Sequence, residues 1–516
     1  MEVTIESLGN VKDKVAAAIS GFKGPSLHYA DLRLEVFEGR GAGAIKGGMR
    51  GAAEDYGIAI GARAYAKSGK FFAAGMCGRV LGKEQLEHAD KQAKEMLKIS
   101  FSRAKANLKC KAMLAKKYPA FGKSLTGGRL ADAKAHTDTV KAEFKKDPRD
   151  FSLEEMSKRA EDISANLQKI EGIATNSVGM VAGIGRKIFA STEGALIDQE
   201  KALADAYIFV AAGGKAMETF GESLGDFAGT EVFDGENPHG KTIEEFAEFI
   251  AQGTIEVSNA PAMKATENVT VITDPWYNSL LSHEITGHPS EADRALKREA
   301  AWAGRAWWFR GVDDNKFGQE VASKEVTVFS DPTIKGFGHY KYDDEGVKAK
   351  KILNINKGVL NEFLNSRETA AVLGREPNGG MRACSADMVP IIRMNNTCFA
   401  PGTWKKDELF RETRTGYYAV GAKTPSIGET RQNFKITCWK LYKIENGEQT
   451  QLYRMGGVTG DSYQFLKSID AVADDFMLYN IPNCGKGTPM QTMKVGNGGP
   501  HIRGRATVSG AHMMGE

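Results

Sequence analysis

The first half of the chain alternates between strand-like and helix-like segments, and this alternation constrains the fold more than any other feature of the sequence. Residues 27–80 show alternating apolar and polar positions separated by glycine-rich turns, the pattern of β-strands and hairpins. Over residues 82–172, Leu, Ala and Met recur at spacings of three and four, which predicts helices. Strand-like segments return over residues 175–215. We therefore expect an N-terminal α+β region covering residues 1–260.

The second half is predicted to form a separate, β-rich unit. A chain of 516 residues is too long for one ordinary core, so two or three packed units are expected. The segment Asn259-Ala260-Pro261-Ala262 follows an amphipathic helix predicted over residues 242–252, and it marks a boundary. Beyond it, Asn356-Lys357-Gly358 and Asn446-Gly447 each separate two extended segments, as in β-hairpins. The predicted fold class is α+β, with a β-rich C-terminal domain over residues 261–516 that carries the helix described below.

The character of the N-terminal residues and the spacing of the cysteines favour a reducing compartment. The N-terminus has no apolar core of signal-peptide length, and no run of about 18 apolar residues occurs, so we expect no membrane partner. The cysteines form no CxxC pair, which argues against a disulfide framework or a ribbon-type zinc site. They are Cys77, Cys110, Cys384, Cys398, Cys438 and Cys484. A cytoplasmic location is the simplest interpretation.

A strongly basic stretch lies within the helical segment. The stretch from Lys91 to Lys123 contains ten lysines and arginines and only one acid, Glu95. The stretch could bind nucleic acid, or it could be the solvated face of a helix. Few aromatic residues are interleaved with the cations, which favours the solvated face. The net charge of +4 supports neither interpretation, and we expect no nucleic-acid partner.

The motif with the clearest chemical content is His283-Glu284-x-x-x-His288. Asp274 followed by Pro275 is a good helix start, with a capping side chain and then proline at the first helical position. Histidines at i and i+4 of a helix reach one metal ion together. Here they stand at i and i+5, roughly 140° apart on a regular α-helix. Both can bind one ion only if the helical turn is widened or interrupted.

The sequence between the two histidines provides such an interruption. Gly287 is a weak helix former, and Pro289 disfavours the α conformation at His288. We expect a π-bulge or a helix break here, and a new helix starting at Ser290 with Asp293 completing a capping-box-like pattern. A structural histidine pair remains the alternative to a metal site.

Two imidazoles leave a hydrolytic zinc ion short of one protein ligand. Spacing and composition do not identify the third. The candidates are Asp293, Glu291, His339, the run Asp343-Asp344-Glu345, and Cys484. Glu291 and Asp343 could instead orient the imidazoles from outside the ligand set.

At this point the chain resembles the TldD/PmbA family, once described as modulators of DNA gyrase. YADLRLEVFEG looks like the family's N-terminal region. Successive blocks look like its C-terminal domain, in order: HEITGHPSEAD, YDDEGVKAKKILNINKGVLNEFLNSRETA, RMNNTCFAPG, YKIENG and NCGKGTPMQTMKVGNGGPHIRG. The resemblance therefore extends over nearly the whole chain, and the order of the blocks is more specific than any single one.

The resemblance implies a zinc-dependent metallopeptidase that cleaves extended or unfolded peptides in an interior cleft. The HExxxH-bearing member is the TldD subunit, so the resemblance implies His283, His288 and Cys484 as zinc ligands and Glu284 as the general base. It also implies a homodimer, or a heterodimer with a PmbA/TldE-like paralogue. Lys486, next but one to Cys484, is expected to favour its thiolate.

Two segments depart from what the family leads us to expect. The lysine-rich helical stretch is long, and a tryptophan-rich segment follows the motif, with Trp302, Trp307 and Trp308. We expect the tryptophans to serve in core or interface packing. The competing function is a non-catalytic peptide- or protein-binding regulatory subunit with a structural metal, against which the intact Glu284 argues.

Overall fold

The computed structural model describes residues 4–119, 128–302, 304–309 and 315–510, and it confirms the α+β class. Seven strands of the first half form one sheet in the order β3-β2-β1-β5-β6-β4, with β7 paired to β6. The strands are β1 (Leu27–Ile45), β2 (Gly48–Ser68), β3 (Phe71–Val80), β4 (Thr137–Val140), β5 (Ile173–Ser191), β6 (Leu196–Gly213) and β7 (Met217–Asp226).

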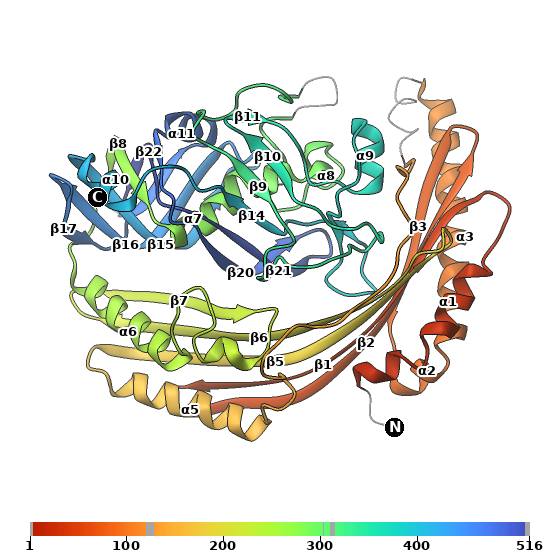
Figure 1. Ribbon diagram of the computed structural model, residues 1–516, viewed down its shortest axis with the longest axis horizontal. Coiled ribbons are helices and arrows are strands. Elements are labelled where there is room, and N and C mark those ends of the chain that lie inside the picture. The colour runs from red at the N-terminus through yellow and green to blue at the C-terminus, as the bar shows by residue number, and fades with distance from the viewer. Residues whose placement is uncertain (1–3, 120–127, 303, 310–314, 511–516) are drawn as a thin grey trace.

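This N-terminal sheet is long and curved, and the second half of the chain lies on its concave side (Figure 1). Helices cover the convex side, where α1, α2 and α3 lie at one end and α5 lies at the other (Figure 1). The helices of the first half are α1 (Lys12–Ser20), α2 (Lys83–Glu87), α3 (Ala89–Lys117), α5 (Leu153–Lys169) and α6 (Ile243–Asn259), with 3-10 turns at Ile5–Leu8 and Thr230–Phe233.

Local signals explain why these helices start where they do. The Ser152 hydroxyl accepts from the Glu155 amide while the Glu155 carboxylate accepts from the Ser152 amide, a capping box that begins α5. Thr242 and Glu245 do the same for α6, where the sequence predicts a helix. Inside residues 82–172, however, the chain between α3 and α5 contains β4, which pairs in parallel with β6. Periodicity misses it because four residues are too few to show a period.

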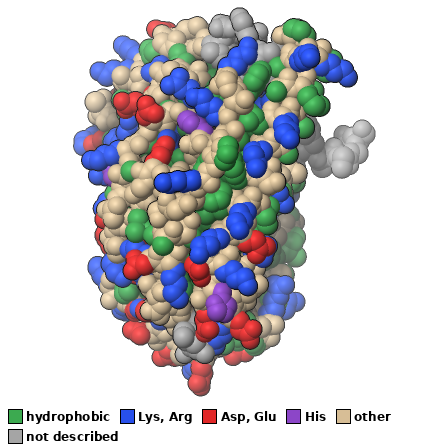
Figure 2. All heavy atoms as spheres, turned by 90° about the vertical axis from the view of Figure 1, so that its right-hand side faces the viewer, with side chains coloured by type: hydrophobic (Ala, Val, Ile, Leu, Met, Phe, Trp, Pro, Cys, Tyr) green, Lys and Arg blue, Asp and Glu red, His purple; other side chains and the backbone are tan. Residues whose placement is uncertain are grey.

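The basic stretch lies along α3, which places its apolar face on the sheet. Met96, Leu97 and Ala104 are fully buried against β2 and β3. Figure 2 shows the side of the molecule that carries α1 and α3, where Lys and Arg side chains are scattered among hydrophobic and neutral ones. This arrangement is that of a solvated helical face, and the absence of a nucleic-acid partner stays a prediction.

The second half forms two further mixed sheets, ordered β11-β10-β9-β14-β21-β20 and β15-β8-β22-β18-β16-β17, with β19 paired to β22. The hairpins predicted around Asn356-Lys357-Gly358 and Asn446-Gly447 are β10–β11 and β16–β17. The strands are β8 (Thr266–Thr273), β9 (Val328–Ser330), β10 (Ile352–Asn356), β11 (Val359–Leu360), β12 (Met381–Arg382), β13 (Ile391–Ile392), β14 (Asn396–Phe399), β15 (Thr415–Ile427), β16 (Asn433–Glu445), β17 (Glu448–Tyr453), β18 (Gly457–Asp461), β19 (Ala471–Val472), β20 (Met477–Lys486), β21 (Gln491–Gly499) and β22 (Ile502–Ser509).

Short helices connect these strands, and α7 begins the segment that carries the HExxxH motif. The helices are α7 (Pro275–Ser282), α8 (Ala292–Ala295), α9 (Arg367–Leu373), α10 (Lys406–Arg411) and α11 (Ser462–Ser468). The boundary predicted at 259–262 falls between the end of α6 and the start of β8, and the division at residue 260 stays a prediction. Within the described residues, every helix is too short or too polar to cross a membrane.

Buried ion pairs join the curved sheet to the second half of the chain. Arg63 of β2 lies 2.6 Å from Asp31 of β1 and 3.1 Å from Glu345. Lys187 of β5 lies 3.2 Å from Asp344. Asp344 and Glu345 of the acidic run therefore anchor the second half against the sheet.

Candidate metal centre

The segment that carries the histidines starts as predicted. The Asp274 carboxylate accepts from the Tyr277 amide at 2.6 Å, and Pro275 occupies the first turn of α7. The helix packs against β15, β20 and β21, so that it lies between the two C-terminal sheets and is almost fully buried. The histidines that follow α7 are therefore fixed by the core rather than by a surface loop.

The predicted widening of the turn is confirmed. Residues His283–Gly287 form a π-helical turn, and His288–Ser290 continue as a 3-10 turn. The two imidazoles consequently face each other, with ring centroids 4.6 Å apart and planes at 84°. Gly287 has a steric role here, because a Cβ at this position would overlap the sulfur of Met394.

The helix start predicted at Ser290 with a capping Asp293 is wrong. Helix α8 begins after Glu291, with no side-chain cap. The Ser290 hydroxyl donates instead to the carbonyl of Thr286 at 2.6 Å, and the Asp293 carboxylate accepts from Lys486 at 2.7 Å. A side-chain bond to the preceding turn at Ser290 and a tertiary partner at Asp293 thus replace the capping bond that the sequence pattern suggested.

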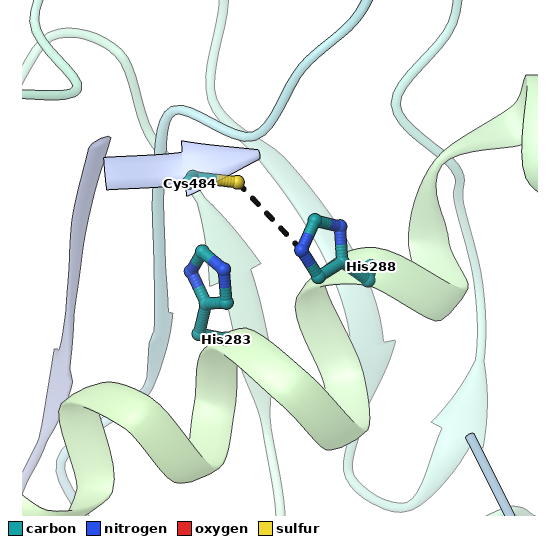
Figure 3. Close-up of side chains that lie close together, drawn as sticks. All are labelled: His283, His288 and Cys484. Carbon is teal, nitrogen blue, oxygen red and sulfur yellow. Dashed lines mark hydrogen bonds between the residues drawn. The ribbon is translucent and has the colours of Figure 1, made fainter. Parts of the chain in front are cut away.

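Cys484 on β20 completes a cluster with the two histidines, although it lies 196 residues after His288 (Figure 3). Its Sγ lies 3.6 Å from His288 Nε2, and one ligand atom from each of the three residues lies within 4.8 Å of the others. Tetrahedral zinc with bonds of about 2.3 Å to sulfur and about 2.0 Å to nitrogen separates such ligand atoms by about 3.5 Å. The donor set, its spacing and its burial therefore fit a zinc ion.

The ring nitrogens that face away from this cluster are held by other side chains. His288 Nδ1 contacts Glu291 Oε2 at 2.9 Å, and His283 Nδ1 contacts Asn497 Oδ1 at 3.0 Å. The Glu291 carboxylate in turn accepts from Arg294 at 2.9 Å and lies 3.2 Å from the Lys486 ammonium. Such partners fix the orientation of each ring and increase its basicity toward a metal.

Electrostatics inside the cluster favour a metal-binding thiolate. Burial alone would raise the pKa of Cys484, but the imidazoles of His283 and His288 and the guanidinium of Arg393 hold it well below its usual range. The pKa of His283 rises to about 9 because the Cys484 thiolate and further partners outweigh its burial. The Lys486 ammonium pairs with Asp293 and Glu291, and its expected effect on the thiolate stays a prediction.

Glu284, the proposed base, has a partner that sequence reasoning missed. Arg431, in the loop between β15 and β16, donates from Nη1 to Glu284 Oε2, and both side chains are buried. Burial raises the pKa of Glu284, but Arg431 and the two histidines lower it below its usual range overall. The carboxylate is therefore ionised and able to accept a proton. No local pattern links residues 147 positions apart, so only the fold could reveal this pair.

The other residues proposed as a third ligand have different roles. Glu291 orients His288, as suggested, whereas Asp343 accepts from the backbone amides of Glu345, Val347 and Met381 and does not reach a histidine. His339 Nδ1 contacts the Pro332 carbonyl at 2.8 Å.

The tryptophan-rich segment contributes mainly to packing. Trp308 is buried and donates to the Pro289 carbonyl at 2.8 Å, which holds the turn after His288, and Trp307 packs against the same core. Trp302 is 62% exposed, and its carbonyl accepts from Arg431. Core packing therefore holds for two of the three tryptophans.

Known proteins resemble this chain in sequence, and others resemble it in fold. The model of the PmbA/TldA metallopeptidase C-terminal domain matches residues 266–510. A metalloprotease of Methanocaldococcus jannaschii is 31% identical over 93% of this chain and 97% of its own length. A zinc metalloprotease TldD homolog of Saccharolobus solfataricus is 34% identical over 45% of this chain and 49% of its own. The crystal structure of TldE from Thermococcus kodakarensis superposes with a TM-score of 0.64 at 15% identity, covering 98% of this chain and 100% of that one.

Proposed function

The chain belongs to the PmbA/TldD metallopeptidase family, and from this premise we propose that it is a zinc-dependent peptidase in which His283, His288 and Cys484 hold the metal and Glu284 is the general base. The observation that carries the proposal is the convergence of these four side chains in one buried site. A purely structural metal would not need an ionised carboxylate beside its ligands, so Glu284 favours catalysis over a regulatory role.

The chemistry follows from the side chains present. Zinc at this site would act as a Lewis acid and bring the pKa of a bound water to about 7. Glu284 would accept a proton at a carboxylate oxygen and later deliver it to the leaving amine. Arg431 keeps that carboxylate ionised, and Glu291 and Asn497 keep the two imidazoles in place. Extended or unfolded peptides are the proposed substrates.

Replacement of the base tests the mechanism. The change Glu284→Gln should retain zinc and fold, because the amide still accepts a hydrogen bond from Arg431. It should lower the cleavage rate of fluorescein-labelled casein by a factor of about 10² to 10⁴, the usual contribution of a general base. Zinc per chain by atomic emission is the control. Cleavage at the wild-type rate with full zinc would contradict the assigned mechanism.

We also propose that the protein acts as a dimer, either of two copies or with a TldE-like paralogue. The support is its membership of a paired family and its similarity in fold to TldE. Light scattering of the 56.0 kDa chain, alone and mixed with a paralogue, should give a mass near twice that of one chain in at least one sample. A fully active monomer would be evidence against this assembly.

A further inference from the structure

A large cavity lies between the curved sheet and the second half of the chain, and no proposed step uses it. Its volume is about 770 Å³. Strands β1, β5 and β6 form one wall, and the segments 335–344, 382–384 and 492–494 form the other. It is large enough for several residues of an extended peptide.

Almost every cation that lines this cavity is neutralised by a carboxylate. Among the described residues, the exceptions are Lys201 of β6 and Arg382 of β12, for which no ion pair forms. The neutralised pairs are Lys141–Glu200, Lys145–Glu236, Arg186–Asp198, Lys187–Asp344, Lys335–Glu143, Lys341–Asp138 and Lys494–Asp205. Lys201 and Arg382 act on each other electrostatically, so the two cations without an ion pair lie in the same part of the cavity wall.

Lys201 lies on the cavity wall, where its ammonium can contact a ligand. Its ammonium lies 4.0 Å from the centroid of the Phe227 ring, on the cavity wall. Burial and the nearby cations Arg382 and Lys187 lower its pKa to about 7, against the smaller opposite effect of Glu35 and Asp344. A bound anion would restore the charged form, so binding and protonation would support each other.

Arg382 supplies the second charge from inside the wall. Its side chain is 4% exposed and stacks on Tyr340 at 4.4 Å, and its Nη2 donates to the Met394 carbonyl. Its Nε and Nη1 have no hydrogen-bond partner. A guanidinium is always charged, and a buried one without an anion is costly. It therefore projects a positive potential into the cavity.

The same residues connect the cavity to the metal centre. Met394, which accepts from Arg382, also packs against Gly287 in the turn between the histidines. On the other side, Met493 lines the cavity and is the register partner of Cys484 across β20 and β21. The wall of the cavity thus adjoins the proposed catalytic site through Met394 and Met493, while His283, Glu284, His288 and Cys484 lie behind that wall and do not line the cavity.

Two acids on the wall, Asp226 and Glu231, need to be considered. Glu231 forms no ion pair with a described residue, and its carboxylate accepts instead from the backbone amides of Lys145, Lys146 and Gly229. Asp226 also lacks an ion-pair partner, but burial raises its pKa to about 6, and the charged groups that act on it are Glu231 and Lys335. It does not neutralise Lys201.

We propose that Lys201 and Arg382 form a carboxylate-binding subsite that positions an acidic group of the peptide substrate beside the metal centre. The proposal rests on the proposed function for the identity of the ligand as a peptide. The carboxylate could belong to the C-terminus of the peptide or to an aspartate or glutamate side chain.

Calorimetry with three peptides in the zinc-loaded Glu284→Gln protein tests this, because no cleavage interferes. The first is an acetylated alanine-rich hexapeptide with a free C-terminal carboxylate, the second its C-terminal amide, and the third the amide with one internal glutamate. We expect at least one carboxylate peptide to bind about tenfold more tightly than the plain amide, as hydrogen bonds to charged groups imply. The identity of that peptide distinguishes the C-terminus from the side chain.

Variants of the cavity lysines complete the test. Lys201→Met should remove the preference and leave the affinity for the plain amide unchanged, and Lys201→Arg should keep the preference. Lys335→Met, in the same cavity but paired with Glu143, is the matched control and should behave as the parent. Equal affinity for all three peptides, no binding of any, or a preference that survives Lys201→Met would overturn the subsite. Since the readout is binding, failure of the peptidase mechanism would appear separately, in the casein assay.

Discussion

The candidate metal centre and helix α3 differ in where their charged side chains lie: the metal centre buries them, and α3 exposes most of them to solvent. Around the turn from His283 to Ser290, the chain buries Glu284, Glu291, Arg294 and Lys486 among apolar side chains. At α3 every lysine except the half-buried Lys111 is exposed, and only apolar and small residues are buried. Removing ions from water costs several kcal/mol each unless partners compensate them. The first region therefore bears a cost that the second avoids, and such cost is typical of a functional site.

The largest expected effect concerns Cys484, where burial and chemistry coincide. Cys484→Ser should release zinc and abolish cleavage, since catalytic zinc sites rest on three protein ligands. Serine at Cys77, Cys110, Cys384, Cys398 or Cys438 should leave zinc near one per chain. Cys77, Cys398 and Cys438 are the stringent controls, because they are buried as well. Atomic emission gives the zinc content per chain for all six variants. If Cys484→Ser kept its zinc, the third ligand would have to be another residue.

The next effect concerns the buried charges themselves. Lys486→Met removes the ammonium shared by Glu291 and Asp293, and loss of one partner of a buried pair typically costs about 3–5 kcal/mol. Urea denaturation should show a correspondingly lower midpoint. The matched control is Lys467→Met, which breaks the surface pair with Glu320 and should leave the midpoint unchanged. Equal midpoints for both variants would remove the contrast between the two regions.

A smaller effect is expected from glycine replacement. Gly287→Ala would force a methyl group against Met394, and overpacking of this kind costs about 1–3 kcal/mol. Gly51→Ala, on β2 where a Cβ meets nothing within 4 Å, should be neutral or slightly stabilising. Thermal unfolding should therefore give Gly287→Ala a lower melting temperature than Gly51→Ala. A neutral Gly287→Ala would mean that the turn between the histidines tolerates rearrangement.

The smallest effect belongs to α3. Replacing its exposed Lys91, Lys98 and Lys109 with Gln should change the free energy of unfolding by no more than about 0.5 kcal/mol per site. A salt titration of binding to a mixed-sequence DNA duplex checks the alternative. If DNA binds tightly, and this binding weakens steeply with salt and disappears in the triple variant, then α3 is a nucleic-acid-binding surface.

Sequence reasoning was strongest where the signal is local. The cap at Asp274, the widened turn imposed by Gly287 and Pro289, and the two hairpins follow from neighbours in the chain. The helix start predicted at Ser290 was wrong, because Ser290 donates to the carbonyl of Thr286 in the preceding turn and Asp293 accepts from the distant Lys486. Sequence reasoning also missed β4, which is stabilised by its pairing with β6 and not by its own residues.

The sequence by itself determined the α+β class, the helix that presents the histidines and the interruption between them, because backbone preferences and hydrophobic periodicity act within a few residues. Only the tertiary structure decided that Cys484 meets His288, that Arg431 holds Glu284 and that Asn497 orients the ring of His283. These contacts join residues on different strands and loops. Distance along the chain carries no information about them, since the pairing of the strands brings them together.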